Sequence, residues 1–302
     1  MNPPRQATPA PTTEAWALLL LLSLPWGGSF VFFRVLAGSL PVLTTVWSRV
    51  ALASAALFVL RRLHGERARI PWRDVSVMAV LNNVVPFSLL AWGETRVTAG
   101  LAAVLNATTP AFAVLIAATL GGEALSRGRV AGCLLAFAGV AVLIGPAVLA
   151  GGDALGAFAC LGAACCYGFA ALWGRRLRGT PPLASAAGQC MASAVLLLPA
   201  MALIDRPWAL PMPGVVTWGA ILGLAWLSTA FAYVIFFRIV VVSGPQNAML
   251  VTFLTPVTGV LLGAIFLGET VAPRMLAGLL LIAAGLAAID GRLGSRLARR
   301  IA

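Results

Sequence analysis

Charged side chains are scarce in this chain of 302 residues. Only 10% of the residues are Asp, Glu, Lys or Arg, and 61% are hydrophobic, whereas soluble domains carry about 25% charged residues. Lysine is absent altogether, so all 21 basic residues other than histidine are arginines. A water-soluble fold cannot bury so large a share of apolar side chains. The composition therefore predicts that lipid is the solvent of this protein.

Further absences exclude whole classes of function. Histidine occurs once, as His64 in a basic connection, and all five cysteines lie within apolar stretches, so no Cys/His metal-binding spacing exists. Without lysine there is no Gly-x(4)-Gly-Lys phosphate-binding loop, which excludes ATP-driven pumping by this chain alone. No pair of acids and no Ser/His pair lies at mid-span, which argues against an intramembrane protease. We therefore expect no enzymatic activity, no metal and no cofactor.

Ten apolar stretches are long enough to cross a bilayer, which takes about 20 residues as a helix. They are separated by breaks that contain Gly, Pro or Arg. The predicted spans are residues 15–36, 41–60, 74–92, 99–121, 128–149, 154–174, 182–204, 213–237, 246–268 and 272–290. The first span leads into further membrane segments, so we interpret it as a retained helix and not as a cleaved signal peptide. Residues 1–13 are predicted to be a disordered cytoplasmic tail, and residues 292–302 a basic one.

The distribution of arginine predicts the orientation in the membrane. With the N-terminus in the cytoplasm, sixteen of the 21 arginines fall on the inner side and four at outer ends, while Arg49 lies within the second span. Since inner connections of membrane proteins are enriched in Arg and Lys, both termini are predicted to be cytoplasmic. The net charge of +12 is then a membrane feature, and we expect no nucleic acid as a partner.

The sequence repeats itself with an offset of 146 residues. Residues 102–145 and 248–291 share 16 identities in 44 positions, where chance would give about four in a chain of this composition. A weaker match relates residues 26–34 to residues 167–175, which are 141 apart. Because each copy would contain five spans, an odd number, the second copy must enter the membrane upside down. Inverted repeats are typical of secondary transporters that work by alternating access.

These features resemble the EamA family, a branch of the drug/metabolite transporter superfamily. The resemblance rests on the two five-helix halves, on PWGGSFVFFR in the first span and on Pro-x(11)-Gly-Glu at the ends of the fourth and ninth spans. It covers essentially the whole chain after the tail. It implies export of amino acids and related metabolites from bacteria, close to the branch that exports aromatic amino acids. It also implies a central cavity lined by spans 1, 3, 4, 6, 8 and 9, with spans 5 and 10 at the back.

The sequence thus predicts an all-α integral membrane protein with ten transmembrane helices in two inverted-topology repeats, residues 14–150 and 151–291. The predicted function is export of amino acids across the bacterial inner membrane, and we expect a monomer that takes a small-molecule substrate. Efflux of cationic drugs is the alternative, which the lack of mid-span carboxylates disfavours. The same lack favours a facilitator driven by the gradient of its substrate, although proton coupling through Glu94, Glu123 or Glu269 stays open.

Polar and aromatic side chains near mid-span are candidates for substrate contact, because such groups are costly in lipid. The predicted contacts are Trp26, Ser29, Asn82, Asn83, Asn106, Tyr167, Trp226, Tyr233 and Thr252. The two adjacent asparagines could bind both charges of a zwitterion or could only bond between helices. The tryptophans could line an apolar pocket or only pack, and the hydroxyls commonly bond within their own helix. Arg49 could bind a substrate carboxylate, pair within the bundle or snorkel, and the sequence leaves its role open.

The two Pro-to-Gly-Glu segments are predicted to be hinged helices. The residues assigned to this role are Pro110, Pro256, Gly122, Glu123, Gly268 and Glu269. Each proline is expected to kink its helix near mid-span, and each glycine to let the chain turn sharply into the next span. The glutamates are expected to be structural, either capping the next helix or pairing with Arg127, Arg129 or Arg274.

Overall fold

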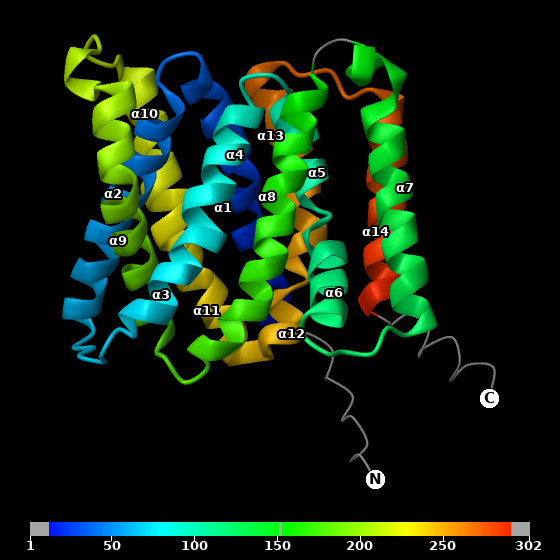
Figure 1. Cartoon of the computed structure of the whole chain (residues 1–302), viewed down its shortest axis with the longest axis horizontal. Coiled ribbons are helices and arrows are strands. Elements are labelled where there is room, and N and C mark those ends of the chain that lie inside the picture. The colour runs from blue at the N-terminus through cyan, green and yellow to red at the C-terminus, as the bar shows by residue number, and fades with distance from the viewer. Residues whose placement is uncertain (1–11, 151–152, 291–302) are drawn as a thin grey trace.

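The computed structural model describes residues 12–150 and 153–290, which are helical throughout apart from short connections (Figure 1). The first half contains α1 (Thr13–Ala37), α2 (Val42–Leu63), α3 (Trp72–Ala79), η1 (Val80–Val84), α4 (Val85–Gly93), α5 (Ala99–Asn106), α6 (Thr109–Thr119) and α7 (Arg127–Ala150). The second half contains α8 (Ala154–Trp173), η2 (Gly174–Leu177), α9 (Pro182–Ala200), η3 (Met201–Asp205), η4 (Pro207–Ala209), α10 (Val215–Leu222), η5 (Gly223–Phe231), α11 (Ala232–Ser243), α12 (Pro245–Ala248), α13 (Val251–Leu267) and α14 (Pro273–Asp290). The expected tails lie outside the described residues, except that Thr12 caps α1 and Thr13 begins it.

Consecutive elements join into spans that correspond in order to the predicted ones, although the eighth ends at Ser243 and not at the predicted residue 237. Within the described ranges, nine helical stretches are long and apolar enough to cross a membrane, and α13, with 17 residues, is a shorter tenth. The third span consists of α3, η1 and α4, and the eighth of α10, η5 and α11. The prediction of an all-α membrane protein with two five-helix repeats is confirmed.

The second half is inverted relative to the first. In Figure 1 the connection from α6 to α7 lies at the lower end of the bundle, while the equivalent connection from α13 to α14 lies at the upper end. The helix α1 begins at the lower end, whereas α8, which begins the second half, starts at the upper end. We use "lower end" and "upper end" in this sense below.

The two halves contact each other through glycines at equivalent positions of the repeat. A Cβ added to Gly27 of α1 would lie 2.2 Å from Thr258 Oγ1 and 2.7 Å from Gly259 N of α13. A Cβ added to the equivalent Gly168 of α8 would lie 3.0 Å from Ala113 N of α6. Small residues let membrane helices approach closely in this way. Each half therefore packs its first helix against the fourth-span helix of the other half.

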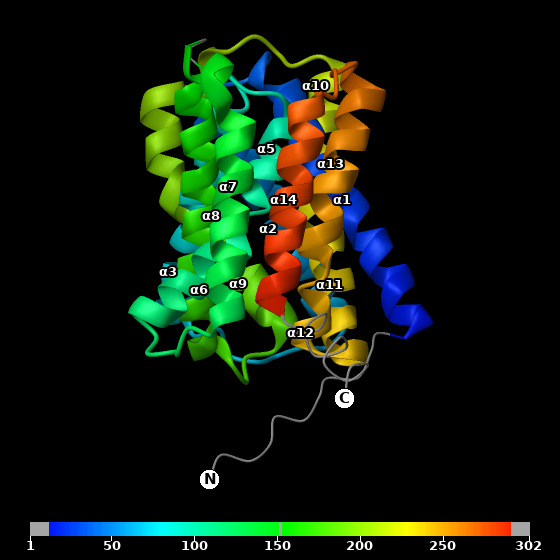
Figure 2. The ribbon, with the colours of Figure 1, turned by 90° about the vertical axis from the view of Figure 1, so that its right-hand side faces the viewer.

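The fifth and tenth spans form a separate pair on one side of the bundle. Figure 2 shows α7 and α14 side by side, and this is the most extensive helix pairing in the described structure. Gly132 of α7 packs against Gly285 of α14, and Gly139 of α7 packs against Gly278 of α14. Because these glycines are repeat equivalents, the pairing is itself nearly symmetric. Its position fits the expectation that these two spans lie behind the others.

The two proline-containing spans are interrupted at different points. In the fourth span the helix breaks at residues 107–108, and Pro110 stands in the first turn of α6, where its missing N–H has no helical partner to lose. In the ninth span the break comes earlier, at residues 249–250, and Pro256 lies inside the continuous α13. The structure thus differs from the expected pair of equal kinks. Gly122 and Gly268 both adopt left-handed backbone angles, with φ of 67° and 65°.

Candidate functional site

The adjacent asparagines lie where the third span departs from α-helical geometry. Asn82 and Asn83 belong to the π-helical turn η1, between α3 and α4. Pro86 follows in the first turn of α4 and has no N–H to donate to the Asn82 carbonyl. Single π-helical turns of this kind are frequent at functional sites. The turn directs two amides into the bundle, and Asn83 is fully buried.

These amides connect three spans through hydrogen bonds. Asn82 Nδ2 lies 3.2 Å from Tyr233 Oη of α11 and 3.3 Å from Gln189 Oε1 of α9. Asn83 Nδ2 donates to Ser193 Oγ of α9 at 3.0 Å, and the Ser193 hydroxyl donates to the Gln189 carbonyl at 2.7 Å. We call these five residues the amide network. It brings together three of the nine predicted contacts.

Arg49 of α2 is a buried cation in the middle of the bundle. Its side chain is 5% exposed, and its Nε donates to Thr229 Oγ1 of η5 at 2.9 Å. The guanidinium carbon lies 3.6 Å from the centre of the Phe87 ring and 5.1 Å from that of Phe33. Over residues 12–150 and 153–290 no carboxylate lies within 4.0 Å of it. The aromatic rings stabilise the cation, but its charge is not neutralised.

Arg49 and the amide network share one region of the interior. Tyr233, which belongs to the network, and Tyr167 of α8 both interact electrostatically with the Arg49 guanidinium. The helix α2 packs along α9 and η5, which supply Gln189 and Thr229. A cation and several neutral donors and acceptors are thereby held at the interface of the two halves. Such a set can bind a carboxylate and an ammonium group together.

Neither tryptophan among the predicted contacts takes part in the amide network. Trp26 is partly buried and packs on Phe236 of α11, with ring centres 5.6 Å apart. Trp226 of η5 is 51% exposed on the outside of the described structure. The structure therefore gives Trp226 no place beside Arg49 or the amide network, because the helix turns its ring outward.

The three remaining predicted contacts are small polar residues. Ser29 Oγ donates to the Trp26 carbonyl, and Thr252 Oγ1 donates to the Met249 carbonyl, so both bond within their own span. Asn106, the last residue of α5, differs because its Oδ1 is buried and has no hydrogen-bond partner. Asn106 is thus the one of the three whose side chain retains an unused buried acceptor.

Sequence reasoning missed the partners on the seventh span. Ser185, Gln189 and Ser193 follow one another at intervals of four residues on α9, and the Gln189 side chain bonds Ser185 Oγ at 3.0 Å. That spacing places all three on one helix face and was visible in the sequence. The resemblance assigned the cavity to other spans, whereas the structure adds α2 and α9 to the polar interior.

The upper end of the bundle contains a polar pocket of about 480 Å³. It is lined by residues of α1, of the connection from α4 to α5 and of the end of α13: Arg34, Ala37, Gly38, Thr95, Thr98, Leu267 and Glu269. The Glu269 carboxylate accepts hydrogen bonds from the backbone N–H groups of Ala99, at 2.7 Å, and Gly100, at 2.9 Å. It therefore caps α5 of the other half and not the next helix, because α13 packs on α5.

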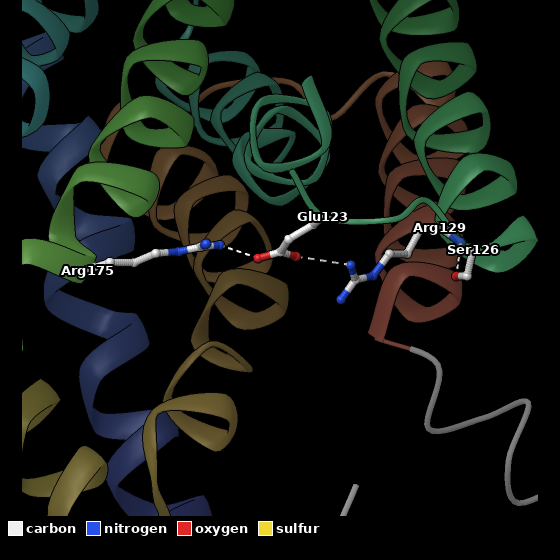
Figure 3. A network of polar contacts seen from close by, with 4 residues as sticks. All are labelled: Glu123, Ser126, Arg129 and Arg175. Atoms are coloured by element: carbon white, nitrogen blue, oxygen red, sulfur yellow. Dashed lines mark hydrogen bonds and ion pairs between the residues drawn. The ribbon is translucent and has the colours of Figure 1, made fainter. Parts of the chain in front are cut away.

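The lower end is held by ion pairs of the equivalent glutamate. Figure 3 shows Glu123 between Arg175, which follows α8, and Arg129 of α7. Arg175 donates to one carboxyl oxygen, and Arg129 Nη1 lies 3.3 Å from the other. The hydrogen bond from Arg175 lowers the pKa of the Glu123 carboxyl below its ordinary value. Pairing with Arg129 was among the expected alternatives, and Arg175 was not.

A second pocket, of about 720 Å³, opens sideways and is apolar. It lies between α1, α10, η5 and α13, and Phe32, Leu227 and Leu262 are among its lining residues. None of the nine predicted contacts lines this pocket or the polar pocket at the upper end. In the described conformation the amide network is therefore packed within the bundle and does not line either pocket.

Comparisons with known proteins agree on a transporter fold. The model of the EamA-like transporter family matches residues 14–145 and again residues 154–289. A probable terminal-alkyne amino-acid exporter of Streptantibioticus cattleyicolor is 35% identical over 131 residues, which is 42% of this chain and less than half, 43%, of that protein. The uncharacterized transporter YvbV of Bacillus subtilis is 25% identical over 93% of this chain and 92% of its own length. A crystal structure of another protein shares the fold with a TM-score of 0.67 at 22% identity, over 92% of this chain and 97% of that one.

Proposed function

Because this chain belongs to the EamA-like transporter family, we propose that it is a secondary transporter that exports amino acids across the bacterial inner membrane by alternating access. The two inverted halves supply the architecture that alternating access needs. The similarity to a probable amino-acid exporter over 131 residues supports the choice of cargo.

Arg49 is the observation that carries the choice of an amino acid. A guanidinium buried in a membrane protein is costly unless an anion neutralises it. Among the described residues Arg49 directly contacts a hydroxyl and two aromatic rings, and no carboxylate lies within 4.0 Å of it. A substrate carboxylate bound there would supply the missing negative charge, and bonds between arginine and a carboxylate are among the strongest in proteins.

The amide network supports a substrate that carries a second, positive group. Gln189 Oε1, Tyr233 Oη and Asn83 Oδ1 all lie within hydrogen-bond distance of Asn82 Nδ2, which has only two hydrogens, so at least one of these oxygens can accept from an ammonium group. Neutral oxygen atoms suit a zwitterion, because a carboxylate in the same place would favour a purely cationic substrate. Among the described residues no acidic side chain takes part in the amide network.

The arginines give the proposed orientation. The connections at the lower end contain most of the arginines, including Arg61, Arg127 and Arg175, and this excess supports the assignment of that end to the cytoplasmic side. The upper end then faces the periplasm. The ion pairs of Glu123 link elements at the proposed cytoplasmic end, and the polar pocket lies at the other end.

Counterflow in proteoliposomes tests this function. Vesicles with purified protein are loaded with unlabelled amino acids, and uptake of a trace of each labelled amino acid is measured. The matching amino-acid amide and the decarboxylated amine serve as competitors that lack the negative charge. We expect the amino acid to exchange and these two compounds to compete at least about tenfold more weakly, because they lose a charged hydrogen bond.

Variants of Arg49 test the proposed contact between this arginine and the carboxylate of the substrate. Arg49→Gln should weaken amino-acid binding by about tenfold to a hundredfold, with Arg49→Lys intermediate. Arg206→Gln, an exposed arginine beyond the seventh span, is the matched control. If the amine exchanges as well as the amino acid, or if a cationic dye alone is transported, efflux of cationic compounds becomes the better assignment.

A further inference from the structure

Glu94 is the one acidic side chain that is fully buried among the described residues. It follows the last residue of α4, and neither of its carboxyl oxygens has a hydrogen-bond partner. Its backbone carbonyl, in contrast, accepts a hydrogen bond from Arg34 Nη1 at 2.6 Å. An ionised carboxylate in this place would lose its hydration and gain no hydrogen bond in return. The geometry therefore suits the neutral acid.

Charged and titratable groups face Glu94 from four neighbouring elements. Burial raises the pKa of the Glu94 carboxyl well above its ordinary value, and the negative charge of Glu269 raises it further. Arg34 of α1 and Arg49 of α2 act in the opposite direction. The Cys160 thiol of α8 also interacts with Glu94. Burial is the largest of these effects, so the two arginines leave the pKa of the Glu94 carboxyl raised in this conformation.

Glu94 directly follows a close contact between the two halves. Gly93 of α4 packs so closely on α8 that an added Cβ would lie 2.8 Å from Cys160 Sγ and 3.0 Å from the Gly156 carbonyl. Since α4 belongs to the first half and α8 to the second, this contact must change when the halves rock. Glu94 thus lies next to an interface that the transport cycle is expected to rearrange.

The polar pocket at the upper end lies close to Glu94 along the chain. The next residue along the chain, Thr95, lines the polar pocket of about 480 Å³ together with Arg34 and Glu269. Arg34 contacts both features, since it lines the pocket and also binds the Glu94 carbonyl. Thr95 directly follows Glu94, so the residue with the buried, unpartnered carboxyl is the chain neighbour of a residue that lines the pocket.

We propose that Glu94 is the proton-binding site of the transport cycle, protonated in the described conformation and deprotonated when the contact between α4 and α8 opens. The step is an acid dissociation: the O–H bond of the carboxyl breaks, the proton passes to water in the polar pocket, and the carboxylate remains with Arg34 and Arg49 as its counterions. This inference rests on the proposed transport function. It replaces the expected facilitator by a proton-coupled transporter.

The steady-state accumulation of substrate under a pH gradient tests the proposal. Proteoliposomes with the full chain receive a labelled amino acid that shows counterflow, and a gradient of one pH unit is imposed in each orientation. For one proton per substrate, the gradient should drive up to about tenfold accumulation in one of the two orientations. In Glu94→Gln the inside-to-outside ratio should fall to one whatever the exchange rate, because a steady-state ratio does not depend on rate. Glu14→Gln, which removes an exposed carboxylate paired with Arg238, should keep the ratio of the unmodified chain.

The outcomes separate this inference from the proposed function. Absence of counterflow with every amino acid would overturn the substrate assignment and this inference with it. Counterflow with a ratio of one in the unmodified chain, or an undiminished ratio in Glu94→Gln, would overturn the proton site alone. If Glu94→Gln does not fold, the unmodified chain is treated with a carbodiimide during exchange, and labelling of Glu94 is measured by mass spectrometry. Coupling that survives complete labelling of Glu94 would equally overturn the proposal.

Discussion

The two halves of the molecule share a Gly-Glu ending but use it differently at the two ends of the bundle. At the lower end Glu123 accepts from Arg175 and Arg129 (Figure 3). At the upper end Glu269, its equivalent 146 residues later, accepts instead from the backbone of Ala99 and Gly100. The same residue type therefore joins side chains at one end and caps a helix at the other.

The arginines near these glutamates show the same asymmetry. Arg34 corresponds to Arg175 in the repeat of residues 26–34 at 167–175. Arg175 binds Glu123, whereas Arg34 binds the Glu94 carbonyl and lines the polar pocket together with Glu269. Two equivalent Arg–Glu pairs are thus formed at one end and separated at the other. The proposed alternating access predicts such a difference between two inverted halves in each of the two conformations.

Cross-linking the two pairs would change transport most. In a chain without its native cysteines, Glu123→Cys with Arg175→Cys should react readily with a short bifunctional thiol reagent, because these positions are already paired. Arg34→Cys with Glu269→Cys should react slowly at rest and faster when substrate is present. Either cross-link should reduce counterflow to the level of empty vesicles, because each one locks an end that must move.

The single-cysteine variants, treated with the same reagent, are the controls for that experiment. Gel mobility after proteolysis between the two cysteines reports the cross-link, and labelled uptake reports transport. Equal reaction of both pairs at rest would show that the two ends do not alternate, and the comparison drawn above would then fail.

The ends should also respond to pH in opposite directions. Glu94 near the upper end has a raised pKa in the fold, so the folded state holds its proton more tightly than the unfolded chain. Stability should then fall as pH rises above the ordinary carboxyl range, by up to about 1.4 kcal/mol per pH unit, until the raised pKa is reached. Glu123 has a lowered pKa, so its smaller contribution should be present at neutral pH and lost as pH falls through that lowered value.

Thermal unfolding in detergent from pH 4 to pH 9 measures both effects. Glu94→Gln should remove the loss of stability toward high pH, and Glu123→Gln should change only the acid side. The Glu123 effect should stay below about 1 kcal/mol, because this ion pair is more than a third exposed. A profile of Glu94→Gln that parallels that of the unmodified chain would contradict burial of a neutral Glu94.

Much of this architecture could be predicted from the sequence, because lipid imposes strong and simple requirements. The lengths of the apolar stretches, the positions of the arginines and the internal repeat can all be read along the chain. Together they predicted ten spans in two inverted halves. The proximity of Asn82 to Tyr233 also followed from an expectation about polar residues at mid-span. These features depend on the period and position of residues along the chain, which a sequence displays directly.

The rest could not be predicted, because it depends on how helices rotate and tilt against one another. Trp226 and Thr229 lie three residues apart on η5, yet one is exposed and the other bonds Arg49. Glu269 was expected to act near its own connection, but inversion places it on the α5 backbone of the other half. Glu94 looked like a helix-end carboxylate, but its side chain is fully buried, and the residue before it, Gly93, packs closely on α8.

Replacement of either proline by alanine is expected to change transport least, and the two variants compare the fourth span with the ninth. Pro256 interrupts the backbone hydrogen bonds inside the continuous α13, whereas Pro110 occupies the first turn of α6, where a backbone N–H would have no helical partner. Pro256→Ala should restore a bond to the Thr252 carbonyl, stiffen the ninth span and slow counterflow several-fold while raising the melting temperature. Pro110→Ala should change exchange by less than about twofold, since the fourth span is already broken before it. If counterflow slowed equally in both variants, the break at residues 107–108 would depend on Pro110. Proline would then be the source of flexibility in both halves.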